Sequence, residues 1–185
     1  MTTIGNWKRK SRDTVYRNNW ITVFHDEVVN PSGGEGIYGV VRFANLAIGI
    51  IPLDDEGCTW LVGQHRYPHD KYSWEIPEGG GKLGVDPLDS ARRELQEEVG
   101  LGAHRWERIL EMDLSNSVTD EMSVVFLARD LYPLDASPEE TEDLSVKRVP
   151  FSEAVERVMR GEITDAISVA GILKVNALLG VGQGR

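Results

Sequence analysis

The strongest candidates for a chemical function in this sequence are three closely spaced glutamates, Glu94, Glu97 and Glu98. Positions i, i+3 and i+4 of a helix share one face, so the three carboxylates are expected to project from the same side. Mg²⁺ binds a few carboxylates, retains several waters and takes up phosphate oxygens of a substrate. The spacing therefore fits a site for a hard divalent cation. It also fits a solvent-exposed acidic face, which is the common role of a cluster of charged residues on a helix.

The residues on either side of these glutamates predict how they are positioned. Residues 75–85 contain several glycines and a proline, which predicts a loop. Asp86 can then serve as the N-cap of a helix, with Pro87 at its first position. Gly100 can adopt the left-handed conformation that ends a helix. The sequence thus predicts one capped helix that carries all three glutamates.

The composition limits the classes of partner and the location. The 185 residues suffice for one domain, or for one domain with a small appendage, and the net charge is −10. That charge argues against binding nucleic acid or an anionic membrane by bulk attraction. No apolar run approaches membrane-spanning length, so no membrane partner is expected. Cys58 is the single cysteine, and residues 1–12 lack the apolar segment of a secretion signal, so we expect a cytoplasmic protein.

The remaining pattern predicts alternating strands and helices. Residues 20–25 and 38–43 mix β-branched, aromatic and polar side chains around a turn at 30–34. Together they predict a small antiparallel unit over roughly 15–43. The continuous apolar run 46–53 predicts a strand that is buried on both faces. Further strands are expected at 59–64, 122–128 and 145–149, and further helices at 152–160 and 165–179.

The glutamate segment resembles the Nudix box of a known hydrolase family. That motif is G, five residues, E, seven residues, then R-E-U-x-E-E-x-G-U, where U is a bulky aliphatic residue. Here Gly79 is followed in register by Arg-Glu-Leu-Gln-Glu-Glu-Val-Gly-Leu at 93–101. Val85 stands where the family has its first glutamate, a residue with a supporting role, and Asp86 lies next to it.

This resemblance implies the metal ligands. Glu94, Glu97 and Glu98 match the metal-binding glutamates of the family, and the main-chain carbonyl of Glu78 matches a further ligand. The implied metal is Mg²⁺, with Mn²⁺ as a possible substitute. Such ions neutralise a diphosphate and help to activate water, so Glu98 also counts as a catalytic residue.

Other segments resemble the ADP-ribose and ADP-sugar pyrophosphatases of the same family. Glu-Ile-Pro-Glu-Gly at 75–79 is similar to their E-[LF]-P-A-G, and Gln-His-Arg-Tyr-Pro at 64–68 to their Q-[YF]-R-x-P. The stretches 140–143 and 161–168 resemble a late acidic loop and the start of their last helix. Residues 114–121 lack the proline that many of these enzymes carry there.

The late acidic loop is implied to take part in catalysis. In related enzymes one glutamate of this loop approaches the attacking water or a metal. We assign Glu140 as the general base, which must lie within hydrogen-bond reach of its water, and Glu142 as a metal-binding or positioning partner. Glu139 is an equally available base on sequence alone. The alternative is an acidic loop that is simply solvated.

Five residues are candidates for contacts with the substrate. Arg66 matches an arginine that contacts the substrate, and its guanidinium suits a diphosphate, although it can also be a surface arginine. Trp20 and Tyr38 match two aromatic residues that sandwich the base in a related enzyme type, although aromatic residues of a small sheet also serve packing. Arg42 can pair with phosphate or be exposed. Glu121 can approach the sugar or the metals.

The resemblance implies an α/β fold, the Nudix α/β/α sandwich with a mixed central sheet and a small N-terminal antiparallel β unit. Residues 1–44 are expected to form that unit and to serve dimerisation and binding of the base. Residues 45–185 are expected to form the Nudix hydrolase domain. In related enzymes the N-terminal unit is shared across a homodimer, so a homodimer is expected by analogy.

The implied reaction is hydrolysis of a nucleoside diphosphate sugar. Water attacks the pyrophosphate of a substrate such as ADP-ribose and releases a nucleoside monophosphate and a sugar phosphate. Three alternatives stay open. They are a Nudix hydrolase of other nucleotide diphosphate derivatives, a non-catalytic sensor of an ADP-ribose-type ligand, and a metal-dependent isomerase on the same fold.

Overall fold

The protein forms two compact units. A computed structural model describes residues 1–136 and 143–182. The first unit comprises Met1–Leu46 with Asp113–Met122, and the second comprises Ala47–Met112 with Ser123–Arg185.

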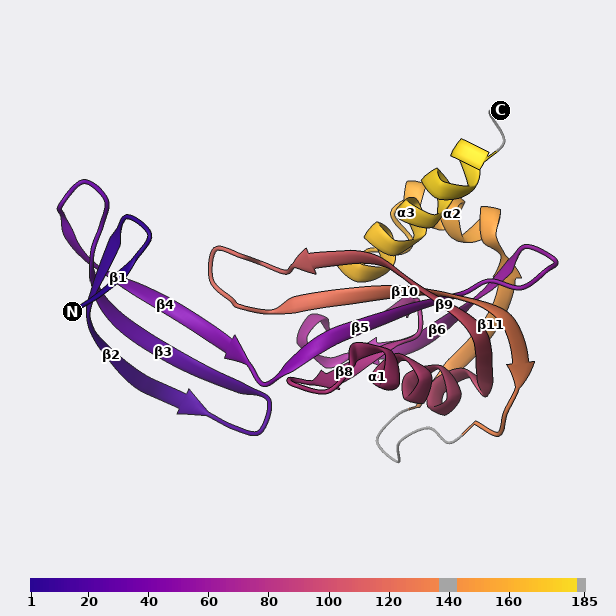
Figure 1. Cartoon of the computed structure of the whole chain (residues 1–185), viewed down its shortest axis with the longest axis horizontal. Coiled ribbons are helices and arrows are strands. Elements are labelled where there is room, and N and C mark those ends of the chain that lie inside the picture. The colour runs from indigo at the N-terminus through magenta and orange to yellow at the C-terminus, as the bar shows by residue number, and fades with distance from the viewer. Residues whose placement is uncertain (137–142, 183–185) are drawn as a thin grey trace. The chain divides into compact units, whose positions relative to one another are not determined.

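The first unit contains a four-stranded antiparallel sheet (Figure 1). Its strands are β1 (Thr2–Ile4), β2 (Trp7–Arg17), β3 (Ile21–Val29) and β4 (Glu35–Phe43), in that order across the sheet. The sequence predicts β3 and β4 but misses β1 and β2. Most side chains of β2 are polar and exposed, so this strand lacks the hydrophobic alternation that indicates a strand.

One asparagine fixes the turn between β3 and β4. Asn30 Oδ1 accepts hydrogen bonds from the backbone N–H groups of Ser32 and Gly34, each at 2.9 Å. Gly33 has a φ of +88°, which glycine adopts without a Cβ clash. The predicted turn is therefore confirmed, and it sets the antiparallel register of the two strands.

The segment Asp113–Met122 packs on the edge strand β4. Val41 N donates to Val118 O at 2.9 Å, and the Tyr38 hydroxyl donates to Ser117 O at 2.6 Å. The segment is thus part of the first unit although it lies far away in the sequence.

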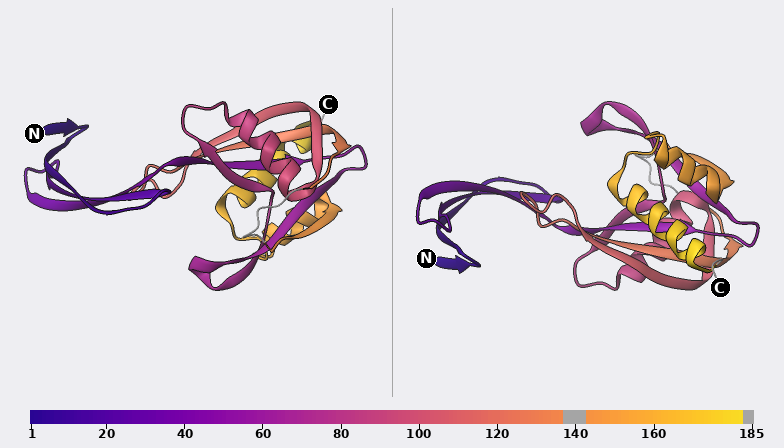
Figure 2. Two further views of the ribbon diagram at one scale, coloured as in Figure 1. Left: turned by 90° about the horizontal axis from the view of Figure 1, so that it is seen from below. Right: turned by 90° about the horizontal axis from the view of Figure 1, so that it is seen from above.

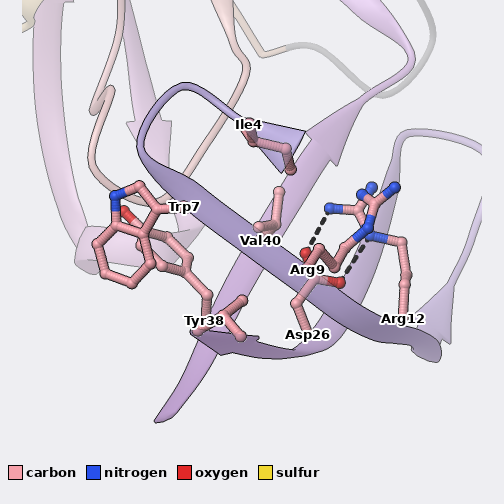
Figure 3. A pocket seen from close by; sticks show the side chains of 8 residues that line it. Ile4, Trp7, Arg9, Arg12, Asp26, Tyr38 and Val40 are labelled. Atoms are coloured by element: carbon pink, nitrogen blue, oxygen red, sulfur yellow. Dashed lines mark hydrogen bonds and ion pairs between the residues drawn. The ribbon is translucent and has the colours of Figure 1, made fainter. Parts of the chain in front are cut away.

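A pocket of about 270 Å³ lies within the first unit (Figure 3). Trp7 and Tyr38 meet edge to face in it, with ring centroids 5.5 Å apart. Arg12 donates through Nε and Nη2 to the two carboxylate oxygens of the buried Asp26, at 2.7 Å each. The pocket is lined by Ile4, Trp7, Arg9, Arg12, Asp26, Val28, Tyr38 and Val40.

The second unit has two sheets with helices on both sides. Its elements are β5 (Asn45–Pro52), β6 (Cys58–Arg66), a 3-10 turn (Tyr67–His69), β7 (Lys71–Glu75), β8 (Glu78–Lys82), α1 (Pro87–Glu94), β9 (Leu101–Asp113), β10 (Met122–Pro133), β11 (Ser145–Pro150), α2 (Phe151–Met159) and α3 (Ala166–Gly182). The larger sheet has the order β8-β5-β10-β9 with β5 parallel to β10, and the smaller sheet has the order β11-β6-β7. Helix α1 lies on one side of β5 and β10, and α2 and α3 lie on the other (Figure 1, Figure 2). The predicted α/β sandwich with a mixed sheet is confirmed.

Strand β5 forms the centre of the core. Ile48 lies toward β8 and α1, whereas Gly49 and Ile51 lie toward α3, as expected for alternate positions of a strand. Ile48, Ile50 and Ile51 are fully buried, which confirms the predicted strand with two buried faces. Burial of such a side chain contributes about 1.5–3 kcal/mol, so β5 anchors both helical layers.

The glycine-rich stretch before α1 differs from its prediction. The sequence predicts a loop, but Glu78–Lys82 is the edge strand β8 of the larger sheet. A Cβ added at Gly79 would lie 2.1 Å from the Glu94 carboxyl carbon, and one added at Gly81 would lie 2.8 Å from Ile48. These glycines therefore permit close approach within a strand and do not indicate a turn. Strand β9 is also absent from the sequence prediction.

The predicted glutamate helix begins as expected but changes its winding. Asp86 Oδ1 accepts a backbone N–H of the first turn at 3.0 Å with Pro87 at the first position, which confirms the N-cap. Gly100 closes the segment with a φ of +71°. Between them the α-helix ends at Glu94, and Leu95–Val99 forms a π-helical turn. Because a π-turn holds more residues than an α-turn, it changes the single face that α-helical spacing predicts.

Two helices end the second unit. Gly161 follows α2 with a φ of +70°, a left-handed conformation that ends a helix. Asp165 precedes α3, and its Oδ2 accepts the Ser168 N–H at 2.7 Å, which caps the helix. None of the helices within residues 1–136 and 143–182 is long and apolar enough to cross a membrane.

Candidate active site

One arginine links the glutamates of the predicted metal site to the sheet. Glu94 and Glu98 are buried, whereas Glu97 keeps part of its side chain exposed. Arg93 pairs with the carboxylates of Glu94 and Glu97, and its Nη2 donates to Gly80 O at 3.0 Å. Arg93 thus holds two of the three glutamates and ties their helix to β8.

The first residues of strand β8 contact the carboxylates of Glu94 and Glu98. Glu78 N donates to Glu98 Oε2 at 3.0 Å, and the missing side chain of Gly79 leaves room for the Glu94 carboxyl group. Buried carboxylates are costly unless a cation or hydrogen-bond donors offset them. Carboxylate and main-chain oxygens are also the ligands that Mg²⁺ and Mn²⁺ prefer, so the donor chemistry fits such an ion.

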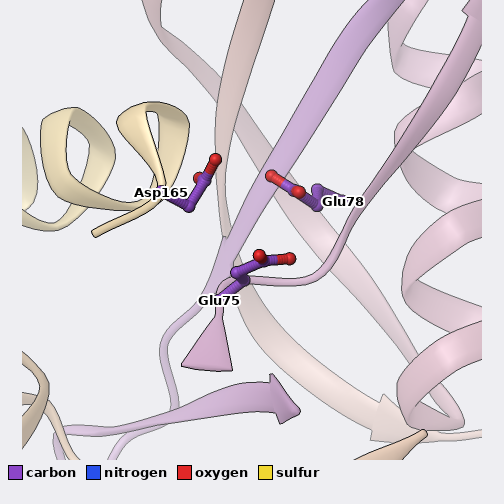
Figure 4. Close-up of side chains that lie close together, drawn as sticks. All are labelled: Glu75, Glu78 and Asp165. Atoms are coloured by element: carbon purple, nitrogen blue, oxygen red, sulfur yellow. The ribbon is translucent and has the colours of Figure 1, made fainter. Parts of the chain in front are cut away.

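A second group of acids includes Glu78 (Figure 4). Ligand oxygens of Glu75, Glu78 and Asp165 lie within 4.8 Å of one another, and the three side chains point toward a common centre. They come from the end of β7, the start of β8 and the residue before α3. In the part of the chain that the structure describes, no other three acids, histidines or cysteines gather this closely. The three glutamates of the box do not form a group this close.

Arg66 supplies positive charge to this acidic group. Its Nε and Nη2 donate to Glu75, and its Nη2 also donates to Glu78. Burial by itself raises the pKa of Glu75, but the hydrogen bonds and the charge of Arg66 outweigh it and lower that pKa. The pKa of Glu78 lies well above its ordinary value because of burial and the negative charges of Asp165 and Glu75. Arg66 is thus anchored between carboxylates, while its contact with a substrate stays a prediction.

The acidic group has more negative than positive partners. Arg66 forms ion pairs with two acids, and Glu78 Oε2 is buried without a hydrogen-bond partner among the described residues. Such surroundings favour the protonated form of a carboxyl group. The family resemblance includes the segments of Glu75 and Asp165 but implies no role for their side chains. The signal in the sequence is that two acids of one short motif flank an isoleucine and a proline.

The other predicted substrate contacts lie in the first unit. Arg42 Nε donates to Asp120 Oδ2 at 3.0 Å, and Phe43 N donates to Asp120 Oδ1 at 2.9 Å. Glu121 follows in the same segment, and its carbonyl accepts the Leu114 N–H at 2.8 Å. Arg42 is therefore paired with a carboxylate in this unit, and its contact with phosphate stays a prediction.

Trp20 and Tyr38 do not come together within one chain. Tyr38 is engaged by Trp7 and lines the pocket of the first unit, whereas Trp20 is 65% exposed. Trp20 O accepts the Ala44 N–H, so this tryptophan lies beside the far end of β4. At the rise of an extended strand, Tyr38 and Ala44 are about 20 Å apart.

The predicted acids of the late loop lie outside the described residues. Glu139, Glu140 and Glu142 fall within 137–142. Their assignment as general base and positioning partner therefore stays a prediction.

Two stretches of the chain match known families. Residues 44–167, more than half of the chain, match the sequence profile of the NUDIX domain. The chain belongs to the Nudix family. Residues 7–41 of this Nudix protein match the nucleoside diphosphate sugar hydrolase N-terminal domain.

Relatives of this Nudix protein match over most of its length. The ADP-ribose pyrophosphatase of Mycobacterium tuberculosis is 35% identical over 172 residues, which cover 91% of this chain and 82% of that protein. The ADP-ribose pyrophosphatase of Bacillus subtilis is 30% identical over 161 residues, which cover 86% of each chain. A crystal structure of an ADP compounds hydrolase matches with a TM-score of 0.87 over 100% of both chains at 24% identity, which shows a shared fold.

Proposed function

We propose that this Nudix protein hydrolyses the diphosphate of a nucleoside diphosphate sugar of the ADP-ribose type. The products are a nucleoside monophosphate and a sugar phosphate. The observation that carries the proposal is the order of the two family matches, in which the N-terminal domain of nucleoside diphosphate sugar hydrolases precedes a Nudix domain. The two relatives of at least 30% identity are ADP-ribose pyrophosphatases, which favours ADP-ribose within this class.

Glu94, Glu97 and Glu98 are the proposed metal-binding side chains, together with the main-chain carbonyl of Glu78. Mg²⁺, or Mn²⁺ in its place, supplies charge neutralisation of the diphosphate and a more acidic bound water. Arg93 holds the carboxylates of Glu94 and Glu97 in position for that role.

The remaining residues bind the substrate and move a proton. Glu140 accepts a proton from the attacking water, and Glu142 helps to position Glu140. Arg66 contacts the diphosphate from its anchorage on Glu75, which orients the guanidinium before the substrate arrives. Arg42 and Glu121 contact phosphate and sugar.

A homodimer belongs to the proposal. The N-terminal β unit serves dimerisation, so that Trp20 and Tyr38 of different chains stack on the two faces of the base. Stacking of this kind contributes about 1–3 kcal/mol per base. Tyr38 lies on β4, whereas Trp20 of the same chain lies beside the far end of this strand. This separation supports a base site to which two chains each contribute one ring. We place the enzyme in the cytoplasm, where its single cysteine, Cys58, stays reduced.

A substrate panel tests the proposal. The purified chain is incubated with ADP-ribose, ADP-glucose, GDP-mannose, ATP and a dinucleoside polyphosphate, each with Mg²⁺, Mn²⁺ or EDTA, and the products are separated by anion exchange. Equal amounts of nucleoside monophosphate and sugar phosphate are expected from ADP-ribose, with metal only. Release of no sugar phosphate from any sugar nucleotide overturns the proposal. Binding without turnover would indicate a sensor, and a rearranged product would indicate an isomerase.

A further inference from the structure

The short segment between β7 and β8 carries the main-chain carbonyl of Glu78, the proposed metal ligand. Two elements hold the backbone of this segment. Pro77 O accepts the Ile50 N–H of β5 at 2.8 Å. Glu78 N donates to Glu98 Oε2, in the π-turn that follows α1, at 3.0 Å. The carbonyl therefore sits on a backbone whose neighbouring polar groups are already engaged.

A third tie comes from the serine in the first turn of α3. Ser168 Oγ accepts the Ile76 N–H at 2.9 Å, and both residues are buried. The Ser168 N–H donates in turn to Asp165 Oδ2 at 2.7 Å, which fixes that turn of the helix. A buried N–H that loses its partner is strongly unfavourable, so the Ser168 hydroxyl determines where the Ile76 backbone can lie.

The position of α3 is itself fixed by close packing on β5. A Cβ added at Gly49 would lie 2.7 Å from Ile167 Cγ2 and 2.9 Å from Ile76 Cδ1. A Cβ added at Gly171 would lie 3.2 Å from Ile51 Cδ1. Glycines on both elements thus let the helix, the strand and Ile76 approach closely. Because Ser168 accepts the Ile76 N–H, it fixes the segment that leads to Glu78 relative to α3.

We propose that Ser168 is a positioning residue for the metal and diphosphate site. Its hydroxyl holds Ile76 and thereby sets the position of the Glu78 carbonyl two residues later. The inference rests on the proposed function in one respect, the use of that carbonyl as a metal ligand. Residues that orient metal ligands typically change metal affinity or activity by about 10–100-fold when they are replaced.

Mn²⁺ binding to the whole metal-free chain tests this inference, because it reports on the site independently of turnover. The dissociation constant is measured by electron paramagnetic resonance of free Mn²⁺ for wild type, Ser168→Ala and Ser168→Cys. We expect Ser168→Ala to bind Mn²⁺ about 10–100-fold more weakly and to need correspondingly more Mg²⁺ for half-maximal hydrolysis of ADP-ribose. The cysteine variant has a similar size and a weak acceptor, so it should lie between the two.

Ser123→Ala is the matched control. Ser123 on β10 is as buried as Ser168, but its Oγ has no hydrogen-bond partner within residues 1–136 and 143–182. This variant should keep the wild-type affinity for Mn²⁺. Wild-type affinity in folded Ser168→Ala, or an equal loss in Ser123→Ala, overturns the inference.

Two further results are also decisive. If Ser168→Ala does not fold, unchanged Mn²⁺ affinity in Ser168→Cys overturns the inference, and a weakened affinity supports it. If the wild type binds Mn²⁺ but hydrolyses no sugar nucleotide, the proposed function fails, while the comparison of Mn²⁺ affinities still decides the role of Ser168.

Discussion

Each unit of this protein holds a buried carboxylate against an arginine, but the two pairs differ in their balance of charge. In the first unit, Arg12 donates two hydrogen bonds to the carboxylate of Asp26. In the second unit, Arg66 meets both Glu75 and Glu78, and Asp165 lies in the same acidic group. Positive charge from Arg12 and Arg9 surrounds the single carboxylate of Asp26, whereas Arg66 faces a surplus of anions.

This difference appears in the pKa values of the acids. Hydrogen bonds from Arg12 lower the pKa of Asp26 even though burial opposes them. In the second unit Arg66 lowers the pKa of Glu75, but burial and the neighbouring acids raise that of Glu78. A carboxylate with a matching cation mainly stabilises its own unit. Ionisable groups with perturbed pKa values, in contrast, concentrate at functional sites. The difference therefore supports a structural role for Arg12 and is consistent with the proposed role of Arg66 at the site.

The largest effect is expected in the second unit, from Glu98→Gln. This change removes a proposed ligand charge but keeps the shape and an acceptor for the Glu78 N–H. Steady-state kinetics should show kcat for ADP-ribose lowered by about 10²–10³-fold, with ADP-ribose binding largely retained in calorimetry. Glu156→Gln, at an exposed position of α2, is the control and should behave as wild type. Equal activity of Glu98→Gln would refute the metal-site assignment.

Arg66→Ala should produce the next largest effect. It leaves Glu75 and Glu78 without their shared cation, and removal of one partner of a buried ion pair is strongly destabilising. Because Arg66 is itself partly solvated, we expect a loss of about 2–3 kcal/mol in the free energy of unfolding in urea. A loss smaller than that of Arg12→Ala would contradict the proposed difference between the two pairs.

Arg12→Ala should have a smaller effect that stays within the first unit. It leaves one buried carboxylate, Asp26, unpaired, at a cost of about 1–2 kcal/mol. Hydrogen exchange should accelerate at the amides of β2 and β3 and stay unchanged in β5. Lys10→Ala, which removes an exposed ion pair with Glu35, should leave exchange as in wild type. Faster exchange throughout β5 would show that the pair does not act locally.

The smallest expected effect is on the pH dependence of the free energy of unfolding, which should differ between the two units. The pKa of Asp26 is lowered on folding, so its contribution is present above the ordinary carboxyl pKa and is lost as the pH falls below it. The pKa of Glu78 is raised, so its contribution is full at low pH and is lost as the pH rises through the folded value. Without metal, Asp26→Asn should therefore cost more at pH 7 than at pH 3, and Glu78→Gln should cost less at pH 7 than at pH 4. Parallel pH trends of the two variants would contradict this assignment.

Sequence predicted those features that depend on neighbouring residues. The N-cap at Asp86, the turn at Asn30 and the two-sided burial of the strand around Ile50 follow from short local patterns, and all are confirmed. Strand β8 was missed because glycine has two physical uses, and a sequence does not show that Gly79 faces the carboxyl group of Glu94. The long strand β2 was missed because its side chains are polar on both faces.

The candidate site shows the same limit. The box glutamates are recognisable because they lie within five residues, but the π-helical winding of Leu95–Val99 has no signal in their spacing. Asp165 and Ser168 meet Glu75 and Ile76 from about ninety residues away, so only the packing of α3 on β5 brings them together. The contact of Arg93 with Gly80 likewise depends on β8 being a strand.

The central claim is that water attacks the diphosphate at a site built by the Nudix box. Its most direct test is hydrolysis of ADP-ribose in H₂¹⁸O with Mg²⁺, followed by mass spectrometry of the products from wild type and Glu98→Gln. The account predicts one ¹⁸O atom in the phosphate of either AMP or ribose 5-phosphate for the wild type, and almost no labelled product for the variant. Absence of ¹⁸O from the phosphate groups of both products, or equal phosphate labelling by both proteins, would contradict it.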